Sequence, residues 1–174
     1  GKVVDMARRL GITAPLSPDP SLALGVYEVS PMEIAGAYAT LAGRGYAATP
    51  YVVRRIRDAA DGSVIYERGT PQGARILSPQ VVAMADNVFS ASVAWGTSKA
   101  AALPDRPAAG KTGTTQDYKD AWFAGYVPQL AAVVWMGNDN GSASDGVYGG
   151  LYPAQMWRAF MMQAMQGQPV KPLN

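Results

Sequence analysis

The 174-residue sequence contains no cysteine and no histidine. The absence of both residue types excludes zinc ribbons, Cys-x-x-Cys redox motifs and catalytic sites that pair a nucleophile with histidine. It also removes the usual side-chain ligands of transition metals. Any catalysis by this chain must therefore use Ser, Thr, Lys, Tyr, Asp or Glu.

Charge is also scarce, because only 16% of the residues are charged, and neither sign dominates. Fifteen Lys and Arg against thirteen Asp and Glu give a formal net charge of +2, and no single tract concentrates the basic residues. A nucleic-acid partner is therefore not expected. The longest apolar run, residues 130–136, is far shorter than the roughly 18 residues that cross a bilayer.

What the sequence does have is enough apolar material for a core, since 48% of the residues are hydrophobic. A chain of about 150 residues buries roughly 68–70% of its unfolded surface without disulfides or metals. We therefore expect one globular domain, or a piece of a larger one.

Helix-start signals occur twice. Ser30-Pro31 with Glu33 forms a capping box with proline at the first helical position, and Ser78-Pro79 repeats the serine–proline start. Apolar residues at helical spacing also predict a short helix over residues 3–10, followed by Gly11, and a final helix that begins near Pro153.

Strand signals occur in the middle and in the second half of the chain. Residues 51–57 and 63–67 flank Asp61-Gly62, which predicts a hairpin with a tight turn. Residues 108–115, 121–127 and 130–137 predict three further strands, the last two joined by a tight connection that favours an antiparallel pair in the centre of a sheet. Residues 12–29, 96–107 and 138–150 are expected to be loops.

The segment Gly110-Lys111-Thr112-Gly113-Thr114-Thr115 carries the most chemistry. Gly-Lys-Thr could end a phosphate-binding loop, but the first glycine of that pattern would fall on Asp105, whose negative charge opposes phosphate. A helix should also follow such a loop, whereas Gly113, two threonines and Asp117 follow here. A nucleotide site is therefore disfavoured.

The same segment has the residue pattern of a strand at the edge of a sheet. Thr112 and Thr114 share one face because side chains alternate along a strand, and Lys111 adds a cation beside them. Gly113 leaves the other face open and lets neighbouring backbone pack closely. This set of donors suits a carboxylate that lies along the strand, and a backbone N–H there could stabilise an oxyanion.

A Lys-Thr-Gly strand is one of three motifs of the serine penicillin-recognising enzymes. The chain resembles the carboxy-terminal half of the transpeptidase domain in class A penicillin-binding proteins, and the resemblance extends over almost all of residues 1–174. The segments that carry it are residues 23–31, 37–42, 95–97, 109–115, 120–126 and 134–139.

The resemblance implies an α/β fold of the β-lactamase and penicillin-binding type, with an antiparallel sheet and flanking helices, of which this chain supplies the carboxy-terminal portion. It implies that Lys111 assists proton movement. It also implies that Thr112 and Thr114 bind the terminal carboxylate of a D-Ala-D-Ala stem peptide or of a β-lactam. The amide of Thr114 would belong to the oxyanion hole, Gly113 would line the substrate strand, and Thr115 and Gln116 would border the acceptor side.

The resemblance further implies acyl transfer through a serine, with no metal or organic cofactor, at the outer face of the bacterial cytoplasmic membrane. Neither a Ser-x-x-Lys nor a Ser-x-Asn element precedes Lys111. We therefore expect the nucleophile on an amino-terminal half of the domain, which is also a partner of this chain, and we expect an uncovered edge and apolar face where that half packs. Three alternatives stay open: a β-lactamase or D,D-carboxypeptidase, a non-catalytic β-lactam sensor, and an inert fragment.

Overall fold

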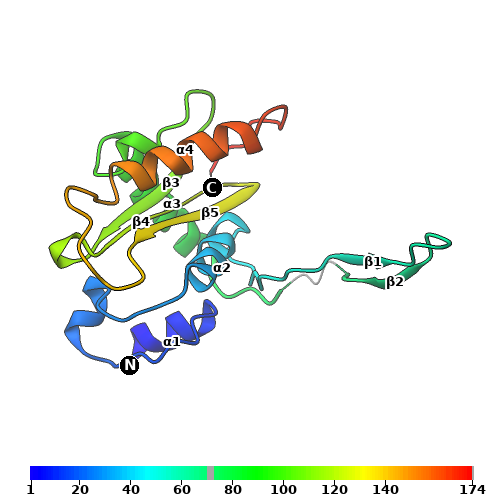
Figure 1. The fold of residues 1–174 in the computed structure, drawn as a ribbon, viewed down its shortest axis with the longest axis horizontal. Coiled ribbons are helices and arrows are strands. Elements are labelled where there is room, and N and C mark those ends of the chain that lie inside the picture. The colour runs from blue at the N-terminus through cyan, green and yellow to red at the C-terminus, as the bar shows by residue number, and fades with distance from the viewer. Residues whose placement is uncertain (70–72, 174) are drawn as a thin grey trace.

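The computed structural model describes residues 1–69 and 73–173. A three-stranded antiparallel sheet lies between helices, and a long hairpin projects from one end of the molecule (Figure 1). The strands of this sheet are β3 (Ala109–Thr114), β4 (Asp120–Val127) and β5 (Leu130–Gly137), in the order β3-β4-β5.

Strand β4 occupies the centre of the sheet. It pairs with β3 on one side and with β5 on the other, and Val127 and Leu130 face each other across a two-residue connection. The expected antiparallel pair is therefore confirmed. Only β4 is central, however, because in the described part of the chain β5 pairs with no other strand.

The helices lie close to where the sequence places them. They are α1 (Lys2–Arg9), α2 (Pro31–Ala42), α3 (Pro79–Ala94) and α4 (Tyr152–Ala164), with short 3₁₀ helices η1 (Pro20–Leu24), η2 (Lys99–Ala101) and η3 (Gln116–Tyr118). The segments expected to be loops thus contain η1 and η2. A 3₁₀ turn this short leaves no periodic pattern in the sequence.

Local capping explains where α2 and α3 begin and where α1 ends. The Ser30 hydroxyl accepts from the Glu33 amide at 3.2 Å, and the Glu33 carboxylate accepts from the Ser30 amide at 2.8 Å. The Ser78 hydroxyl accepts from the Val81 amide at 3.3 Å in the same way. Helix α1 ends at a left-handed Gly11, with φ of +95°, as its position predicts.

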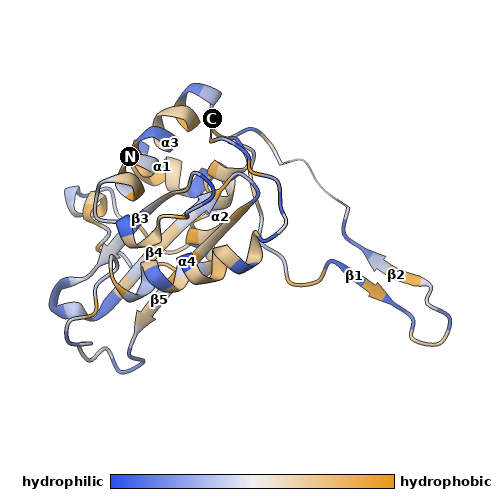
Figure 2. Cartoon of the chain, turned by 90° about the horizontal axis from the view of Figure 1, so that it is seen from above, coloured by the Kyte–Doolittle hydropathy of each residue, from blue (hydrophilic) through white to orange (hydrophobic). Residues whose placement is uncertain are grey.

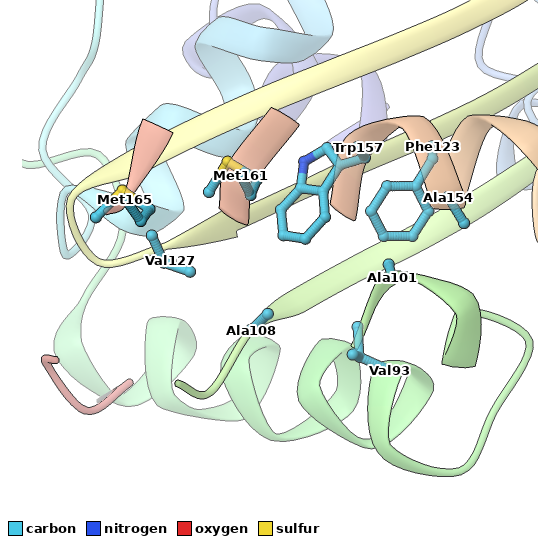
Figure 3. Packing of buried hydrophobic residues seen from close by; sticks show 9 residues of the cluster. All are labelled: Val93, Ala101, Ala108, Phe123, Val127, Ala154, Trp157, Met161 and Met165. Carbon is cyan, nitrogen blue, oxygen red and sulfur yellow. The ribbon is translucent and has the colours of Figure 1, made fainter. Parts of the chain in front are cut away.

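One face of the sheet packs against α4. The rings of Phe123 on β4 and Trp157 on α4 meet edge to face with their centroids 5.2 Å apart, and both side chains are fully buried (Figure 3). Apolar side chains of α4 that point to the sheet thus form the core. The rest of this cluster is Val93, Ala101, Ala108, Val127, Ala154, Met161 and Met165.

The opposite face packs against α2, and α3 lies beside β3. The Tyr38 ring of α2 lies 5.7 Å from the Phe89 ring of α3 and 6.1 Å from the Tyr126 ring of β4. The Tyr126 hydroxyl donates to the buried Asp86 carboxylate of α3. Burial raises the pKa of Tyr38 to about 12, and burial together with the bond to Asp86 raises the pKa of Tyr126. Both phenols therefore stay neutral and hold α3 against the sheet.

The hairpin that projects from the body consists of β1 (Arg55–Arg57) and β2 (Val64–Glu67), and we call residues 44–69 and 73–75 the arm. Tyr46 and Arg75 form an antiparallel bridge at its root. The predicted hairpin is confirmed, but its turn is longer than expected. The Asp58 amide donates to the Ser63 carbonyl at 2.8 Å, so four residues form the loop and only its last, Gly62, has a positive φ.

The carboxylate of Glu33 gives a prediction on stability. It accepts the Ser30 amide and also the Thr13 hydroxyl and amide, at 2.7 and 2.6 Å, which lowers its pKa from 4.5 to about 2. A lowered folded-state pKa stabilises the fold above the unfolded value, and this contribution is lost as pH falls from 4.5 towards about 2.

We expect Glu33→Gln to lower the free energy of unfolding at neutral pH by about 1 kcal/mol, because the amide cannot accept all of these bonds. Urea unfolding at neutral pH and at pH 3 measures both effects, with the exposed Glu28→Gln as the control. The interpretation is wrong if the two variants lose the same stability at neutral pH, or if the gap between Glu33→Gln and the unsubstituted chain does not narrow in acid.

Candidate active site

The Lys-Thr-Gly-Thr segment lies on β3, whose outer edge has no strand partner in the described residues. Register places Thr112 opposite Phe123 and Gly113 opposite Trp122, so the side chains alternate between the two faces of the sheet. Thr112 and Thr114 therefore share the face of Phe123, as the alternation predicts. Lys111 begins on the other face, with Gly113.

The side chain of Lys111 bends over the strand towards Thr112. Its Nζ donates to the Thr112 carbonyl at 2.8 Å and to the Thr112 Oγ1 at 3.2 Å. The Thr112 Oγ1 lies 3.0 Å from the Oγ1 of Thr97, which follows α3. An ammonium and two hydroxyls thus meet at the edge of the sheet, although Lys111 and Thr112 start on opposite faces.

Tight backbone packing fixes Thr97 at this place. A Cβ on Gly96 would lie only 2.8 Å from the Cα of Ser92, so glycine is required where the chain turns beneath the end of α3. The hydroxyls of Ser92 and the buried Ser98 lie 2.8 Å apart and tie the turn to the helix. The position of Thr97 is therefore set by α3, and not by a mobile loop.

Thr114 is held from the other side by the segment that precedes α4. The Gly149 amide donates to the Thr114 Oγ1 at 3.0 Å. A Cβ on Gly149 would lie 2.3 Å from the Trp122 carbonyl oxygen and 2.5 Å from that of Gly113, so the two backbones touch. Because the Thr114 hydroxyl accepts here, its own proton is left to donate to another group.

The charge of Lys111 is uncompensated within the site. Ion pairs among residues 1–69 and 73–173 join Arg55 to Glu67 and Arg106 to Asp105, and none includes Lys111. The ammonium is exposed, while Thr112 beside it is half-buried. An exposed cation flanked by hydroxyl donors can bind an anion such as a carboxylate.

Thr115 and Gln116 lie at the connection between β3 and β4. The Thr115 hydroxyl accepts from the Asp120 amide at 2.8 Å, and the Trp135 indole donates to the Asp120 carboxylate at 2.8 Å, so Thr115 closes the turn. Gln116 is exposed at the start of η3, and neither residue joins the contacts between Lys111, Thr112 and Thr97.

Two residues in these contacts were absent from the predicted site, namely Thr97 and Gly149. Thr97 belongs to the Trp-Gly-Thr segment that contributes to the family resemblance, and that segment was a signal from which Thr97 could have been predicted as a site residue. Gly149 lies in a glycine- and serine-rich segment with no local signal, because its contact with Thr114 spans 35 residues.

Comparisons with known proteins agree on one family. The family model for the penicillin binding protein transpeptidase domain matches residues 17–162. Penicillin-binding protein 2D of Bacillus subtilis is 38% identical over 97% of this chain. Penicillin-binding protein 1A of Aquifex aeolicus is 34% identical over 79% of it. The chain spans about a quarter or less of these relatives, 25% and 18% of their lengths.

Solved structures show the same relationship. The PonA1 protein from Mycobacterium tuberculosis in complex with penicillin V has a TM-score of 0.82 and 30% identity, over 99% of this chain and 51% of that one. Penicillin-binding protein A from M. tuberculosis, solved as an imipenem acyl-enzyme complex, has a TM-score of 0.70 and 28% identity, over 92% of this chain and 42% of that one.

The contact of Gly149 with β3 gives a second prediction. We expect Gly149→Ala to lower the free energy of unfolding by about 1–3 kcal/mol, because its Cβ would overlap backbone oxygens that cannot move aside. Gly69→Ala is the matched control, since a Cβ there meets open space. Thermal unfolding of both variants is the measurement. Equal melting temperatures would show that the segment around Gly149 does not pack on β3 as described.

Proposed function

This chain belongs to the transpeptidase-domain family of penicillin-binding proteins, and we propose that residues 1–174 form the carboxy-terminal part of a serine D,D-transpeptidase domain that cross-links peptidoglycan. The observation that carries the proposal is the meeting of the Lys111 ammonium with the Thr112 and Thr97 hydroxyls at an unpaired strand edge. No carboxylate of the described residues neutralises that ammonium.

In the proposed complex, an extended stem peptide ending in D-Ala-D-Ala lies along β3. Its terminal carboxylate accepts hydrogen bonds from the hydroxyls of Thr112 and Thr114 and is attracted by Lys111. Gly113 leaves space for the peptide. Thr115 and Gln116, at the end of the strand, border the side from which the second peptide arrives.

The proposed reaction is acyl transfer in two steps. A serine hydroxyl attacks the carbonyl carbon of the penultimate D-Ala, and the C–N bond between the two D-Ala residues breaks. The terminal D-Ala leaves with the proton of the serine hydroxyl on its amine, and an ester joins the peptide to the serine. The amide of Thr114 stabilises the oxyanion. An amine of a neighbouring stem peptide then attacks the ester, forms the new amide and releases the serine. No metal or organic cofactor is part of this proposal.

The serine itself is proposed to lie outside these 174 residues, on an amino-terminal half that packs on α3. One side of α3 exposes large apolar residues at spacings of three and four, which is the pattern of a helix that packs on another helix. This row of apolar residues ends two residues before Thr97, whose hydroxyl lies beside Thr112 and Lys111. An amino-terminal half of the domain that covers the row would therefore reach Lys111. The exposed members of the row are Val81, Met84 and Val88 on the helix and Trp95, which follows the helix directly and lies seven residues after Val88.

The proposed location is the outer face of the cytoplasmic membrane, where peptidoglycan is assembled. In the described part of the chain, none of the helices has the length and apolar character to span a bilayer. From the resemblance to class A penicillin-binding proteins, we propose that an amino-terminal segment anchors the protein to this membrane.

Covalent labelling with a fluorescent penicillin tests the proposal. We expect intact-mass analysis to show an adduct on a protein that includes the amino-terminal half, and none on the 174-residue chain alone. An adduct on the short chain would place the nucleophile within it, and no adduct on either would contradict the transpeptidase assignment. Rapid release of the adduct to water would instead favour a β-lactamase or carboxypeptidase.

The hydroxyl of Thr114 gives a quantitative prediction in the same protein. Thr114→Val removes one hydrogen bond to the ligand carboxylate, and a bond to a charged group contributes about 1.5–3 kcal/mol, so acylation by penicillin should slow by about 10-fold to 100-fold. Thr114→Ser keeps the hydroxyl and is the control. The role assigned to Thr114 is wrong if both variants react at the same rate.

A further inference from the structure

The arm, residues 44–69 and 73–75, is not used by the proposed reaction. It extends from the end of the molecule opposite the β3–β4 connection, as both views show (Figures 1 and 2). Every residue of β1 and β2 is exposed. An arm with so little packing against the body contributes little to the core, so core stability does not explain the identity of its side chains.

The arm is enriched in one kind of charged residue, which corrects the expectation that no tract concentrates the basic residues. It contains six of the ten arginines of the chain and none of the five lysines. Its six cations against three acids give a net charge of +3, whereas the other 145 residues, with nine cations and ten acids, carry −1. The positive charge of the whole chain thus originates in the arm.

The three acids of the arm are engaged locally. Glu67 pairs with Arg55 across the two strands. The carboxylates of Asp58 and Asp61 accept backbone amides within the terminal loop, from Ala60 at 2.7 Å and from Ser63 at 2.8 Å. The remaining arginines therefore present their charge to solvent without a carboxylate partner in the described residues.

Two of these arginines are held in place by aromatic rings. The Arg68 guanidinium lies 4.2 Å from the ring centroid of Tyr51, and that of Arg75 lies 4.3 Å from the ring centroid of Tyr46. Stacking restricts the motion of long side chains before anything binds. A partner then loses less conformational entropy when it pairs with them.

Apolar side chains are interspersed with the arginines. Val52 is 94% exposed and Ile65 is 65% exposed, and further large side chains of the arm are close to half exposed. So many large apolar side chains exposed on one short segment are typical of an interaction site in a soluble protein. These further side chains are Tyr51, Val53, Ile56, Val64 and Tyr66.

We propose that the arm docks a second protein, on a surface where carboxylates surround an apolar centre. Arginine and tyrosine are enriched at protein interfaces while lysine is depleted, and the arm has this composition. An anionic membrane attracts lysine and arginine alike, so it would not explain why lysine is absent. Docking at this end leaves the strand of Lys111 accessible.

Fluorescence anisotropy with defined probes tests the proposal in the full-length protein. The probes are a labelled random copolymer of glutamate and tyrosine, labelled polyglutamate, and vesicles of phosphatidylcholine with phosphatidylglycerol. We expect the copolymer to bind most tightly. The variant Arg54→Ser/Arg57→Ser/Arg68→Ser should weaken its binding by about tenfold, the sum expected for three exposed ion pairs.

A matched variant removes the same charge elsewhere, at the exposed residues Lys2→Ser/Arg158→Ser/Lys171→Ser. We expect it to bind the copolymer as the unsubstituted protein does. Equal weakening in both variants would show that net charge alone governs binding, and would overturn the proposal. Tighter binding to vesicles than to the copolymer, or no binding to any probe, would overturn it as well.

A second variant separates the apolar contribution from the charge. Val52→Ser/Ile65→Ser keeps every arginine, so we expect polyglutamate binding to remain and the preference for the glutamate–tyrosine copolymer to disappear. An unchanged preference would contradict the apolar centre of the proposed surface. Equal melting temperatures of all variants confirm that the body of the protein is intact.

Discussion

The edge-to-face contact between Phe123 and Trp157 sets the spacing of α4 from the sheet, and it dictates the residues around it. A Cβ on Gly110 would lie 2.6 Å from the Phe123 ring, and one on Gly125 would lie 2.7 Å from the same ring. Both glycines are therefore needed to accommodate one aromatic side chain. The glycine before Lys111 has a packing role, which explains why Gly-Lys-Thr occurs here without a phosphate loop. The packing of Phe123 in the core and the position of Lys111 at the edge of β3 thus both depend on Gly110.

Family membership and geometry contribute differently to the functional argument. The match to residues 17–162 shows the kind of domain. The geometry shows that a strand edge presents a cation and hydroxyls held by α3 and by the segment before α4. Two elements distant in sequence fix this edge before a ligand arrives, and such preorganisation is what a site that stabilises charge requires. These contacts hold the edge of β3 in place, and the proposed nucleophile would complete the proposed site there.

The sequence predicted those parts of the structure that depend on neighbouring residues. Ser30 and Ser78 each act within one turn of a helix, so their capping could be recognised from order alone. The alternation along β3 likewise gave the shared face of Thr112 and Thr114. The hairpin was found, but its loop was not, because Asp61-Gly62 also suits a longer loop with a left-handed last residue. The contacts of Thr97 and Gly149 join distant segments, and no local pattern encodes them.

The bridge between Tyr46 and Arg75 means that the arm leaves and rejoins the body at one point. Topologically, the arm is a closed insertion: the path of the chain through the core would be the same if a short turn joined α2 to the segment before α3. The entropy of closing a loop rises only with the logarithm of its length, so an arm of this size costs folding only about 2 kcal/mol more than a turn of four residues. Its length and composition can therefore vary among related chains with little effect on the sheet and helices of the body, and selection can act on the arm and the body independently.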